Sequence, residues 1–412
     1  MTLREAEAYL LDLELFGMRF GLDRMHKLMT ALGMPQRRFA SIHVVGSNGK
    51  SSTTRMIAAI LERHGLRTGT YTSPHLRSFA ERIEVGERPL DGAAFGAAVD
   101  RVARAARMVD RTLDEGDRVT QFEALTAAAY HELARRGVEV AVIEAGLGGR
   151  YDATNVIPSR VQVLTGVGLE HTRWLGPTIA DIADEKLAVV PDQGRLVAGE
   201  LDPEAEAVAR RVVAERHARL IRAPKEAETP VRALGSFQRT NFALARTAAE
   251  AFLGRLDTEA VRSAAGEVEV PGRMQVVATD PLTIYDGAHN PAGARALREA
   301  ITEVVGDRAP LVAVVGILDD KDAAGMLSEL AAKAHRIVFT RSPHPRSLSP
   351  ATLLTLNEHV QGPPAETVPD PHAAVARARE LAGPGGAVLA TGSIYLIAAL
   401  VREEPAERAS AL

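Results

Sequence analysis

A glycine-rich segment, residues 45–52, combines residue types that bind phosphate. It reads Val-Gly-Ser-Asn-Gly-Lys-Ser-Ser, follows an apolar run and precedes a helical pattern. Glycines let backbone N–H groups close around a phosphate, Lys50 supplies positive charge, and the hydroxyls of Ser51 and Ser52 can reach a magnesium ion. The strict eight-residue pattern is not met, because Val44 stands where its first glycine belongs. An ordinary Gly/Ser-rich turn is the alternative, but the strand–turn–helix context favours phosphate binding.

Three further polar side chains follow apolar runs of the kind that form strands. Glu144 ends the run 138–143, and in a parallel sheet its carboxylate would share an edge with the phosphate-binding segment. A carboxylate there can hold magnesium directly or through water, although a turn-capping role is the alternative. His171 and Ser73 also come after apolar runs, so they are further candidate ligands at the same edge. Taken singly, such a histidine is more typical of a surface or core position, and such a serine of an ordinary turn.

Short apolar, β-branched runs alternate with amphipathic stretches along most of the chain. The predicted strands are 41–45, 67–71, 138–143, 161–165, 311–316, 337–340 and 387–390. Apolar residues recur at helical spacing at Leu22, Met25, Leu28, Met29 and Leu32, and again at Met56, Ile57, Ile60 and Leu61. This alternation predicts an α/β fold in which right-handed crossovers give a mainly parallel sheet with helices on both faces.

A break in the pattern near residue 270 predicts two domains. The segment 223–236 is polar, carries two prolines and is typical of a loop, while Glu-Val-Pro-Gly at 269–272 ends a helical stretch more sharply. The strand–helix alternation starts again after this point. We therefore predict one domain over residues 1–270 and a smaller α/β domain over residues 271–412.

The composition restricts the classes of protein and partner. The 412 residues carry 49 Lys and Arg against 53 Asp and Glu, and aromatic residues make up 4%, so neither the positive charge nor the stacking surface of a nucleic-acid-binding protein is present. The absence of cysteine excludes disulfides, thiolate metal sites and a cysteine nucleophile. The N-terminal residues include acids where a signal peptide is basic, and the apolar runs are too short to cross a bilayer. We expect a cytoplasmic protein that binds neither nucleic acid nor membrane.

A set of motifs in one order along residues 21–395 resembles a known enzyme family. The most specific are Thr-Ser-Pro-His-Leu at 72–76, Gly-Gly-Arg-Tyr-Asp-Ala-Thr-Asn at 148–155 and Asp-Gly-Ala-His-Asn-Pro at 286–291. They are accompanied by Gly-Leu-Asp-Arg at 21–24, Glu-Arg-Ile at 81–83, Phe-Glu at 122–123, Asp-Lys-Asp at 320–322 and Thr-Gly-Ser at 391–393. Together they resemble the folylpolyglutamate synthase/dihydrofolate synthase family of the Mur ligase superfamily over nearly the whole chain.

The resemblance implies an ATP-dependent ligase that adds L-glutamate to a folate-type carboxylate through an acyl phosphate. The reaction would be tetrahydrofolate polyglutamylation, conversion of dihydropteroate to dihydrofolate, or both. The implied fold is an N-terminal P-loop ATPase domain that carries the folate site, with a smaller C-terminal Rossmann-like α/β domain that closes over the nucleotide. The implied ligands are ATP, Mg²⁺, L-glutamate and folate or dihydropteroate, and we expect a monomer.

Matching the family's motifs residue by residue implies roles for individual side chains. The implied ATP contacts are Asn48, Gly49, Lys50, Ser51, Ser52, Asn241, Arg273 and Asp286, and the implied magnesium ligands are Ser51, Ser73, Glu144 and His171. The implied pterin or folate pocket comprises Gly21, Leu22, Asp23, Arg24, Thr120, Gln121, Phe122, Glu123, Tyr151, Asp152 and Ala153. The catalytic candidates are Lys50, Lys186, His289 and Ser393, and Lys186 matches a lysine that the family carbamylates.

Two departures from the family pattern bear on the site, and two other functions compete. Ser51 stands where the family usually has glycine, which leaves open whether Ser51 or Ser52 meets magnesium, and Tyr151 replaces a leucine beside the pterin pocket. A peptidoglycan-precursor ligase of the same superfamily is disfavoured by the Thr-Ser-Pro-His-Leu motif. A nucleotide-binding module without ligase chemistry is disfavoured because inactive copies usually lose at least one of the residues that match Glu144, His171 and Lys186, and all three are present here.

Overall fold

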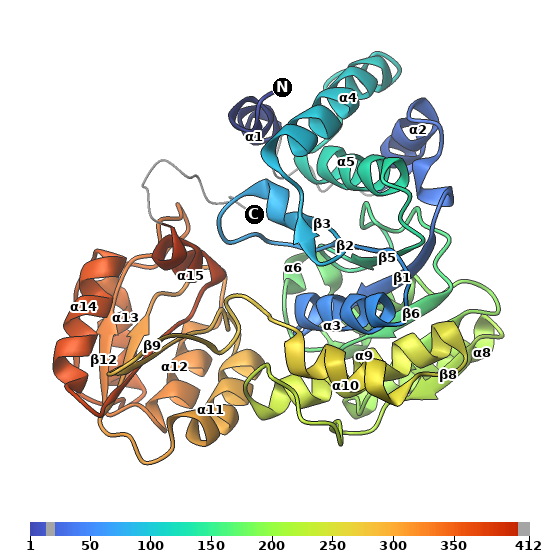
Figure 1. Cartoon of the computed structure of the whole chain (residues 1–412). Coiled ribbons are helices and arrows are strands. Elements are labelled where there is room, and N and C mark those ends of the chain that lie inside the picture. Colours follow the sequence, from blue (N-terminus) through green and yellow to red (C-terminus); the bar gives the residue numbers. More distant parts are fainter. Residues whose placement is uncertain (14–20, 403–412) are drawn as a thin grey trace.

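Two β-sheets, each covered by helices, form the body of the protein (Figure 1). The computed structural model describes residues 1–13 and 21–402. Within them the first sheet has eight strands and the second has six. The chain passes from the first sheet to the second between Arg222 and Gln275. None of the helices in the described ranges has both the length and the apolar character that a membrane crossing needs.

The first sheet is mainly parallel and places β1 between β5 and β6. In spatial order its strands are β4 (Arg88–Pro89), β3 (Ile83–Val85), β2 (Thr68–Tyr71), β5 (Val140–Glu144), β1 (Ala40–Val45), β6 (Val161–Leu164), β7 (Arg195–Ala198) and β8 (Arg219–Arg222). Strand β3 runs antiparallel to both β2 and β4. Val44 of β1 pairs with Glu144 of β5, and Val45 pairs with Leu164 of β6. The carboxyl ends of β1, β5 and β6 therefore meet at one edge of the sheet.

Helices cover both faces of the first sheet, so its central strands are apolar on both sides. Val140 and Val142 of β5 pack in one layer, while Ala141 and Ile143 of the same strand pack in the other. This is the period-two alternation of a strand with both faces buried. One layer contains α3 (Lys50–Arg63), α9 (Ser236–Leu253) and α10 (Thr258–Glu267). The opposite layer contains α1 (Leu3–Asp12), α2 (Asp23–Ala31), α4 (Gly92–Asp110) and α5 (Gln121–Arg135). Three more helices follow β6 and β7 in the chain, namely α6 (Thr172–Leu175), α7 (Ile179–Leu187) and α8 (Pro203–Glu215).

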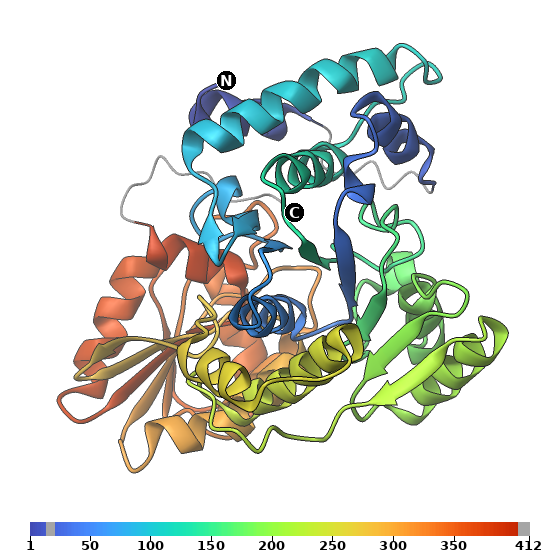
Figure 2. The ribbon, with the colours of Figure 1, turned by 45° about the vertical axis from the view of Figure 1, so that its right-hand side comes forward.

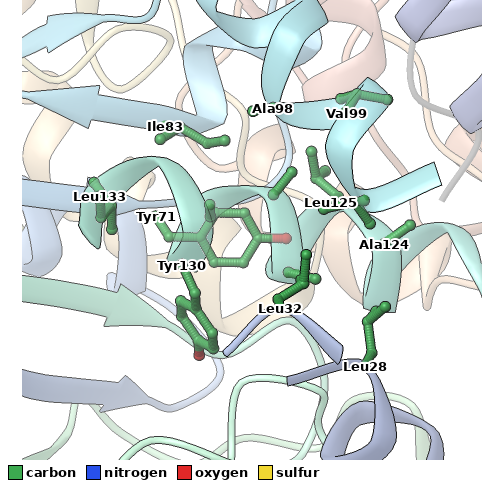
Figure 3. Packing of buried hydrophobic residues seen from close by; sticks show 14 of the residues in the cluster. Leu28, Leu32, Tyr71, Ile83, Ala98, Val99, Ala124, Leu125, Tyr130 and Leu133 are labelled. Atoms are coloured by element: carbon green, nitrogen blue, oxygen red, sulfur yellow. The ribbon is translucent and has the colours of Figure 1, made fainter. Parts of the chain in front are cut away.

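The layer of α1, α2, α4 and α5 has a core that includes two buried tyrosines (Figure 3). Tyr71 comes from β2 and Tyr130 from α5, and both side chains are fully buried beside Leu125. The Tyr71 hydroxyl accepts a hydrogen bond from Thr126 Oγ1 at 3.2 Å, and the Tyr130 hydroxyl donates to the Thr154 carbonyl at 2.9 Å. Each ring thus contributes apolar area while its polar end keeps a partner. Figure 2 shows this layer above the strands, with α3, α9 and α10 below them.

The second sheet is parallel except at one edge. Its strands, in spatial order, are β13 (Ala365–Thr367), β12 (Arg336–Phe339), β11 (Leu311–Val315), β14 (Ala387–Thr391), β10 (Leu282–Tyr285) and the antiparallel β9 (Gln275–Thr279). One face is covered by α11 (Pro291–Val305), α12 (Ala323–Ala331) and α13 (Pro350–His359), and the other by α14 (Pro371–Ala382) and α15 (Ile394–Val401). Ala313 and Val314 of β11 face these two layers in turn.

The predicted α/β fold is confirmed, and the seven predicted strands correspond to β1, β2, β5, β6, β11, β12 and β14. The sequence analysis missed the strands at both edges of each sheet in the described residues, which are β4, β8, β9 and β13, and also β3, β7 and β10. Edge strands lack a buried apolar run because one side faces solvent. Arg88 and Pro89 of β4 are exposed, as are Val276 and Val277 of β9.

Polar and apolar contacts join the two sheet units. Leu76, from the loop after β2, packs in the apolar cluster of α14 and α15, and Arg402 Nε donates to the Leu76 carbonyl at 2.9 Å. Asn48 and Asn290 exchange two hydrogen bonds: Asn48 Nδ2 donates to Asn290 Oδ1 at 3.2 Å, and Asn290 Nδ2 donates to Asn48 Oδ1 at 3.0 Å. These contacts fix the second unit against the edge where β1 ends.

Replacement of Gly149 by alanine is expected to destabilise the protein. A Cβ atom at this buried position would lie 2.6 Å from the Lys186 carbonyl oxygen and 2.8 Å from that of Glu185, and both neighbours are backbone atoms that cannot swing away. Overpacking of this kind costs about 1–3 kcal/mol. Urea denaturation should show that decrease for Gly149→Ala. In Gly266→Ala, where the site near the end of α10 is open and exposed, helix propensity should leave stability equal or slightly higher. An unchanged midpoint for Gly149→Ala would contradict this packing.

Candidate active site

A cavity of about 770 Å³ lies at the carboxyl edge of the first sheet and is closed on its other side by the second α/β unit. It brings together most of the residues named from the sequence. Those that line it are Gly21, Arg24, Asn48, Gly49, Lys50, Ser51, Ser52, Ser73, Thr120, Phe122, Glu123, Glu144, Tyr151, Asp152, Ala153, His171, Asn241, Arg273, Asp286, His289 and Ser393. Four others, Leu22, Asp23, Gln121 and Lys186, are not part of its lining.

The segment after β1 curls around the amino end of α3 and has the form of a phosphate-binding loop. Gly49 caps α3 in the left-handed region, at φ 81°, and a Cβ there would lie 2.5 Å from Asn241 Oδ1. Lys50 Nζ donates to the carbonyls of Gly46 at 3.0 Å and Ser47 at 3.3 Å, which holds the lysine over the loop. The positive end of the helix dipole, free N–H groups and an ammonium group thus face one space, as an anion requires.

Glu144 and Ser51 form a pair of oxygen donors beside this loop. Ser51 Oγ donates to Glu144 Oε1 at 3.0 Å, and the Ser73 backbone N–H donates to Oε2 at 3.2 Å. Burial raises the pKa of Glu144, while Lys50 and the hydrogen bond from Ser51 act to lower it. A hydroxyl and a carboxylate are donors that suit Mg²⁺. The described residues contain no group of three or more metal-ligating side chains, so an ion here would complete its shell with water and phosphate oxygens.

This geometry bears on the choice between the two serines, because the hydroxyl that contacts Glu144 belongs to Ser51. Ser52 also lines the cavity, but its side chain is nearly buried. Ser73 reaches Glu144 through its backbone N–H, at the start of the Thr-Ser-Pro-His-Leu segment. The donor set therefore fits a magnesium ion held between Ser51 and Glu144.

A second group of charges follows β6. His171 has a left-handed backbone, at φ 47°, just before α6, and its side chain lines the cavity. Burial and the nearby Lys321 lower the pKa of His171 to about 4, so its imidazole is neutral and able to act as a ligand. Glu170 is the residue next to it, and it was not singled out from the sequence.

Lys186 lies behind the cavity wall, paired with Glu170. Its Nζ donates to Glu170 Oε1 at 2.9 Å and to the Gly46 carbonyl at 3.0 Å, and 1% of the residue is exposed. Burial lowers the pKa of Lys186, and Glu170 offsets part of that effect. Burial alone would raise the pKa of Glu170, but Lys186 and Lys50 hold it well below its usual range. The lysine is thus tied directly to the phosphate-binding loop.

The second unit contributes residues from the ends of β10 and β14. Asp286 accepts hydrogen bonds from the backbone N–H groups of Ala288 at 2.8 Å and Met274 at 2.9 Å. Burial raises the pKa of Asp286, and Arg273 acts in the opposite direction. His289 Nδ1 lies 3.0 Å from the Gly287 carbonyl oxygen.

Burial and the nearby Arg273 lower the pKa of His289 to about 4, so its ring is neutral. Since a carbonyl can only accept, Nδ1 carries the hydrogen and Nε2 is left with a lone pair. Ser393 is nearly buried, and its Oγ accepts a hydrogen bond from the Tyr395 N–H at 3.1 Å at the start of α15. The second unit therefore brings a neutral base and a hydroxyl to the cavity.

The opposite end of the cavity is built from α2, α5 and the loop after β5. Arg24 Nε donates to Glu123 Oε1 at 3.0 Å, and Glu123 also completes the capping box of α5 with Thr120. Asp152 is nearly buried and accepts from the Leu147 N–H at 2.8 Å. Gln121 was placed in this pocket from the sequence, but its Nε2 donates to the Leu10 carbonyl at 2.8 Å, inside the helical layer.

Sequence reasoning gave no role to several residues that the structure places in or beside the cavity. Glu170, Asp320, Lys321 and Arg346 all line it. Asn290 contacts the phosphate-binding loop through Asn48. Lys321 and Asn290 belong to motifs that carried the family resemblance, which was the available signal. Arg346 had none, because the loop after β12 has no distinctive pattern.

Comparison with known protein families supports this organisation. Residues 44–252 match the Mur ligase middle domain, and residues 272–394 match the Mur ligase glutamate ligase domain. The chain is 32% identical to the dihydrofolate synthase/folylpolyglutamate synthase of Bacillus subtilis, with 93% of this chain and 94% of that protein covered. It is 33% identical to a probable bifunctional folylpolyglutamate synthase/dihydropteroate synthase of Haloferax volcanii, over 97% of this chain, but spans half the length of that protein.

Solved structures superpose on this protein along nearly the whole chain. Folylpolyglutamate synthase of Mycobacterium tuberculosis, complexed with ADP and AMPPCP, superposes with a TM-score of 0.90 at 31% identity, with 97% of each chain covered. Escherichia coli FolC, in complex with DHPP and ADP, superposes with a TM-score of 0.86 at 28% identity, again over 97% of each chain. Shared domains, sequence and structure together establish that this chain belongs to the folylpolyglutamate synthase/dihydrofolate synthase family of Mur ligases.

Proposed function

We propose that the protein is an ATP-dependent ligase that joins the α-amine of L-glutamate to a folate-type carboxylate, releasing ADP and phosphate. The observation that carries the proposal is that three kinds of chemical group line one cavity. The phosphate-binding loop, the nearly buried carboxylate of Asp152 and the neutral imidazole of His289 from the second unit all line it. The relatives named as folylpolyglutamate and dihydrofolate synthases support the same chemistry for this chain.

The reaction needs activation because a carboxylate is a poor acyl donor at neutral pH. Transfer of the γ-phosphoryl group of ATP to a carboxylate oxygen gives an acyl phosphate and ADP. The glutamate amine then attacks the acyl carbon, and the C–O bond to phosphate breaks as the amide forms. The protein's contribution is mainly positioning and electrostatic stabilisation of the phosphoryl oxygens.

Each step has a candidate group in the cavity. Lys50 and the N–H groups at the start of α3 bind the β- and γ-phosphate oxygens. Mg²⁺ would be held by Ser51 and Glu144, with Ser73 and His171 as further candidate ligands, and when bound it supplies positive charge opposite the phosphate oxygens. These groups stabilise negative charge and form no covalent bonds to the substrate.

His289 is suited to accept a proton from the glutamate amine. Its Nδ1–H is used by the Gly287 carbonyl, so Nε2 is the free acceptor. The lowered pKa keeps the ring neutral but also makes it a weak base, so the assignment rests on the position of Nε2 and not on the pKa. Ser393 provides a hydroxyl on the same side of the cavity. The contacts of Leu76 with the second unit and of Asn48 with Asn290 keep that unit over the site, which limits the access of water to an acyl phosphate.

We propose further that Lys186 works as a carbamate. Attack of its neutral amine on carbon dioxide forms an N–C bond, and the displaced proton leaves to solvent. The unmodified ammonium is neutralised by Glu170, so repulsion from a metal ion is weaker than an isolated charge would give. A carbamate beside Glu170 would instead pair two anions, and that pair suits a bound cation.

The proposed enzyme would work as a cytoplasmic monomer on MgATP, glutamate and a reduced folate or dihydropteroate.

Phosphate release is expected to require both a pteridine-linked carboxylate and glutamate. The cavity joins the nucleotide end to the pocket around Asp152, so neither co-substrate alone should support turnover. In the test, the protein is incubated with MgATP, glutamate and one acceptor, which is dihydropteroate, tetrahydrofolate or a UDP-sugar peptide. Released phosphate is assayed, and the products are identified by mass spectrometry. Turnover with the UDP-sugar peptide and none with either pterin would reject the assignment.

Lys50→Ala should reduce kcat by about 10²–10³-fold, because a charge that faces the transferring phosphoryl group is lost. Steady-state kinetics with saturating MgATP measures this loss. Lys333→Ala removes a lysine that is exposed on the second unit and should leave kcat unchanged. Wild-type turnover in Lys50→Ala would mean that the segment after β1 is an ordinary turn.

Lys186→Ala and Lys186→Arg are both expected to lose activity, because neither can carry a carbamate. A short carboxylic acid such as acetate should partly restore the alanine variant by supplying the missing oxygens, and it should not restore the arginine variant. Protein equilibrated with ¹³C-bicarbonate should show a carbamate signal in the ¹³C spectrum that both variants lack. Near-normal turnover of Lys186→Arg would overturn the carbamate and leave the ligase assignment in place.

A further inference from the structure

A chain of hydrogen bonds runs from the middle of β1 to the wall of the cavity. His43 Nε2 lies 2.8 Å from Thr154 Oγ1, and Thr154 Oγ1 in turn donates to Asp152 Oδ1. His43 and Thr154 are fully buried and do not line the cavity, whereas Asp152 does. The chain therefore links a residue of the sheet core to a carboxylate that a substrate can reach.

The direction of this chain follows from hydrogen-bonding capacity. A carboxylate oxygen can only accept, so the single hydroxyl hydrogen of Thr154 points to Asp152. The Thr154 oxygen must then accept from His43, which places the ring hydrogen on Nε2 and leaves Nδ1 bare. Burial lowers the pKa of His43 to about 3, in agreement with a neutral ring.

Burial of His43 reduces the stability of the fold unless its Nε2–H group donates a hydrogen bond. Its neighbours Ile42 and Val44 are buried apolar residues of β1, and a strand that is covered on both faces ordinarily carries apolar residues throughout. Among the described residues the Nδ1 atom of His43 has no hydrogen-bond partner. A buried polar atom left without a partner is unfavourable, so an apolar side chain would stabilise the strand better.

The Asp152 carboxylate is held at both oxygens. Oδ1 also accepts from the Thr154 backbone N–H at 3.0 Å, and Oδ2 accepts from the Leu147 N–H at 2.8 Å. Thr154 is anchored through its carbonyl, which accepts from Tyr130 at 2.9 Å. These donors oppose the effect of burial, which raises the pKa of Asp152. The backbone N–H of Gly146 also acts on this carboxylate, so protein donors fix its orientation where it lines the cavity.

We propose that His43 and Thr154 are positioning residues that hold the Asp152 carboxylate for an acceptor presenting adjacent N–H donors, as the 2-aminopyrimidine edge of a pteridine does. This inference rests on the proposed function, in which the pocket around Asp152 receives the folate-type acceptor. The two residues act through Asp152 and do not touch ATP, glutamate or the reacting carboxylate. Their loss should weaken binding of the acceptor and leave the chemical step unaffected.

The test uses the isosteric change Thr154→Val, which removes the hydroxyl and keeps the backbone N–H bond to Asp152. Loss of a hydrogen bond to a charged group should raise KM for the pteroate or folate acceptor by about 10-fold. The kcat value and the KM for ATP should stay within about 2-fold of wild type, and Thr154→Ser, which keeps the hydroxyl, should restore the acceptor KM. Thr54→Val is the matched control, since Thr54 is also fully buried and its hydroxyl has no partner in the described residues.

A second measurement detects the hydrogen-bond chain from His43 to Asp152 without any substrate. In protein labelled with ¹⁵N-histidine, the His43 ring should show hydrogen on Nε2 and a bare Nδ1, with the signal assigned by its loss in His43→Asn. In Thr154→Val the Nε2–H resonance should shift, because its acceptor is gone. Hydrogen on Nδ1 in the wild-type protein would overturn the proposal even if the valine variant failed to fold.

The outcomes separate this inference from the proposed function. If the wild-type protein accepts no pteroate or folate, the proposed function fails, and the His43 tautomer still decides whether the chain exists. If pterins are substrates but Thr154→Val leaves the acceptor KM unchanged, or lowers kcat alone, the positioning role is rejected. An equal rise of the acceptor KM in Thr54→Val would also reject it, because the effect would then come from the core in general.

Discussion

The pairing of β1 with β5 on one side and β6 on the other is the constraint on which the site depends. Because all three strands are parallel, their carboxyl ends open at one edge, and the residues that follow them meet there although they are far apart in the chain. The phosphate-binding loop comes from β1, Glu144 from β5, and Glu170 and His171 from β6. A slip by one residue would turn every side chain to the opposite layer, so the fit of particular side chains in the two apolar layers fixes this register.

The charged side chains at this edge are buried in contact with polar or charged partners, and these partners determine how each side chain can act. Lys186 is neutralised by Glu170, Arg24 pairs with Glu123, and Asp152 is held by several donors. In such surroundings electrostatic interactions are stronger than in water, and a charge without a partner is expensive. Glu144 has a hydroxyl and one N–H for partners and keeps a raised pKa, so a cation beside it would stabilise its charged form. The magnesium site that we propose here therefore agrees with how the other charges are compensated.

The sequence predicted the fold class and the residues at the ends of the central strands, because apolar runs and the glycine-rich segment are local signals. It could not predict contacts between distant positions. Asn48 and Asn290 are 242 residues apart, and neither has a local pattern that specifies the other. Gln121 does not line the cavity, because as the first residue of α5, after the capping residue Thr120, its side chain donates to the Leu10 carbonyl inside the helical layer. The edge strands were missed because exposure removes the apolar run that marks a strand.

The two units contribute different groups to the site, and the contacts between the units fix their relative position. Asn290 caps α11 through the Gly293 N–H at 2.7 Å and also binds Asn48 in the phosphate-binding loop. His289 is the residue before it, so the side chain that we propose as the base is connected to the loop after β1. The proposed acceptor pocket belongs to the first unit, through Asp152 and the hydrogen-bond chain from His43. Attack of an amine on an acyl phosphate requires the acceptor, the phosphoryl group and the base to be aligned at once. In the proposed arrangement the phosphate-binding loop follows β1, His289 is connected to that loop through Asn290 and Asn48, and Asp152 is connected to β1 through Thr154 and His43. Strand β1 would thus position all three groups without a separate element for each.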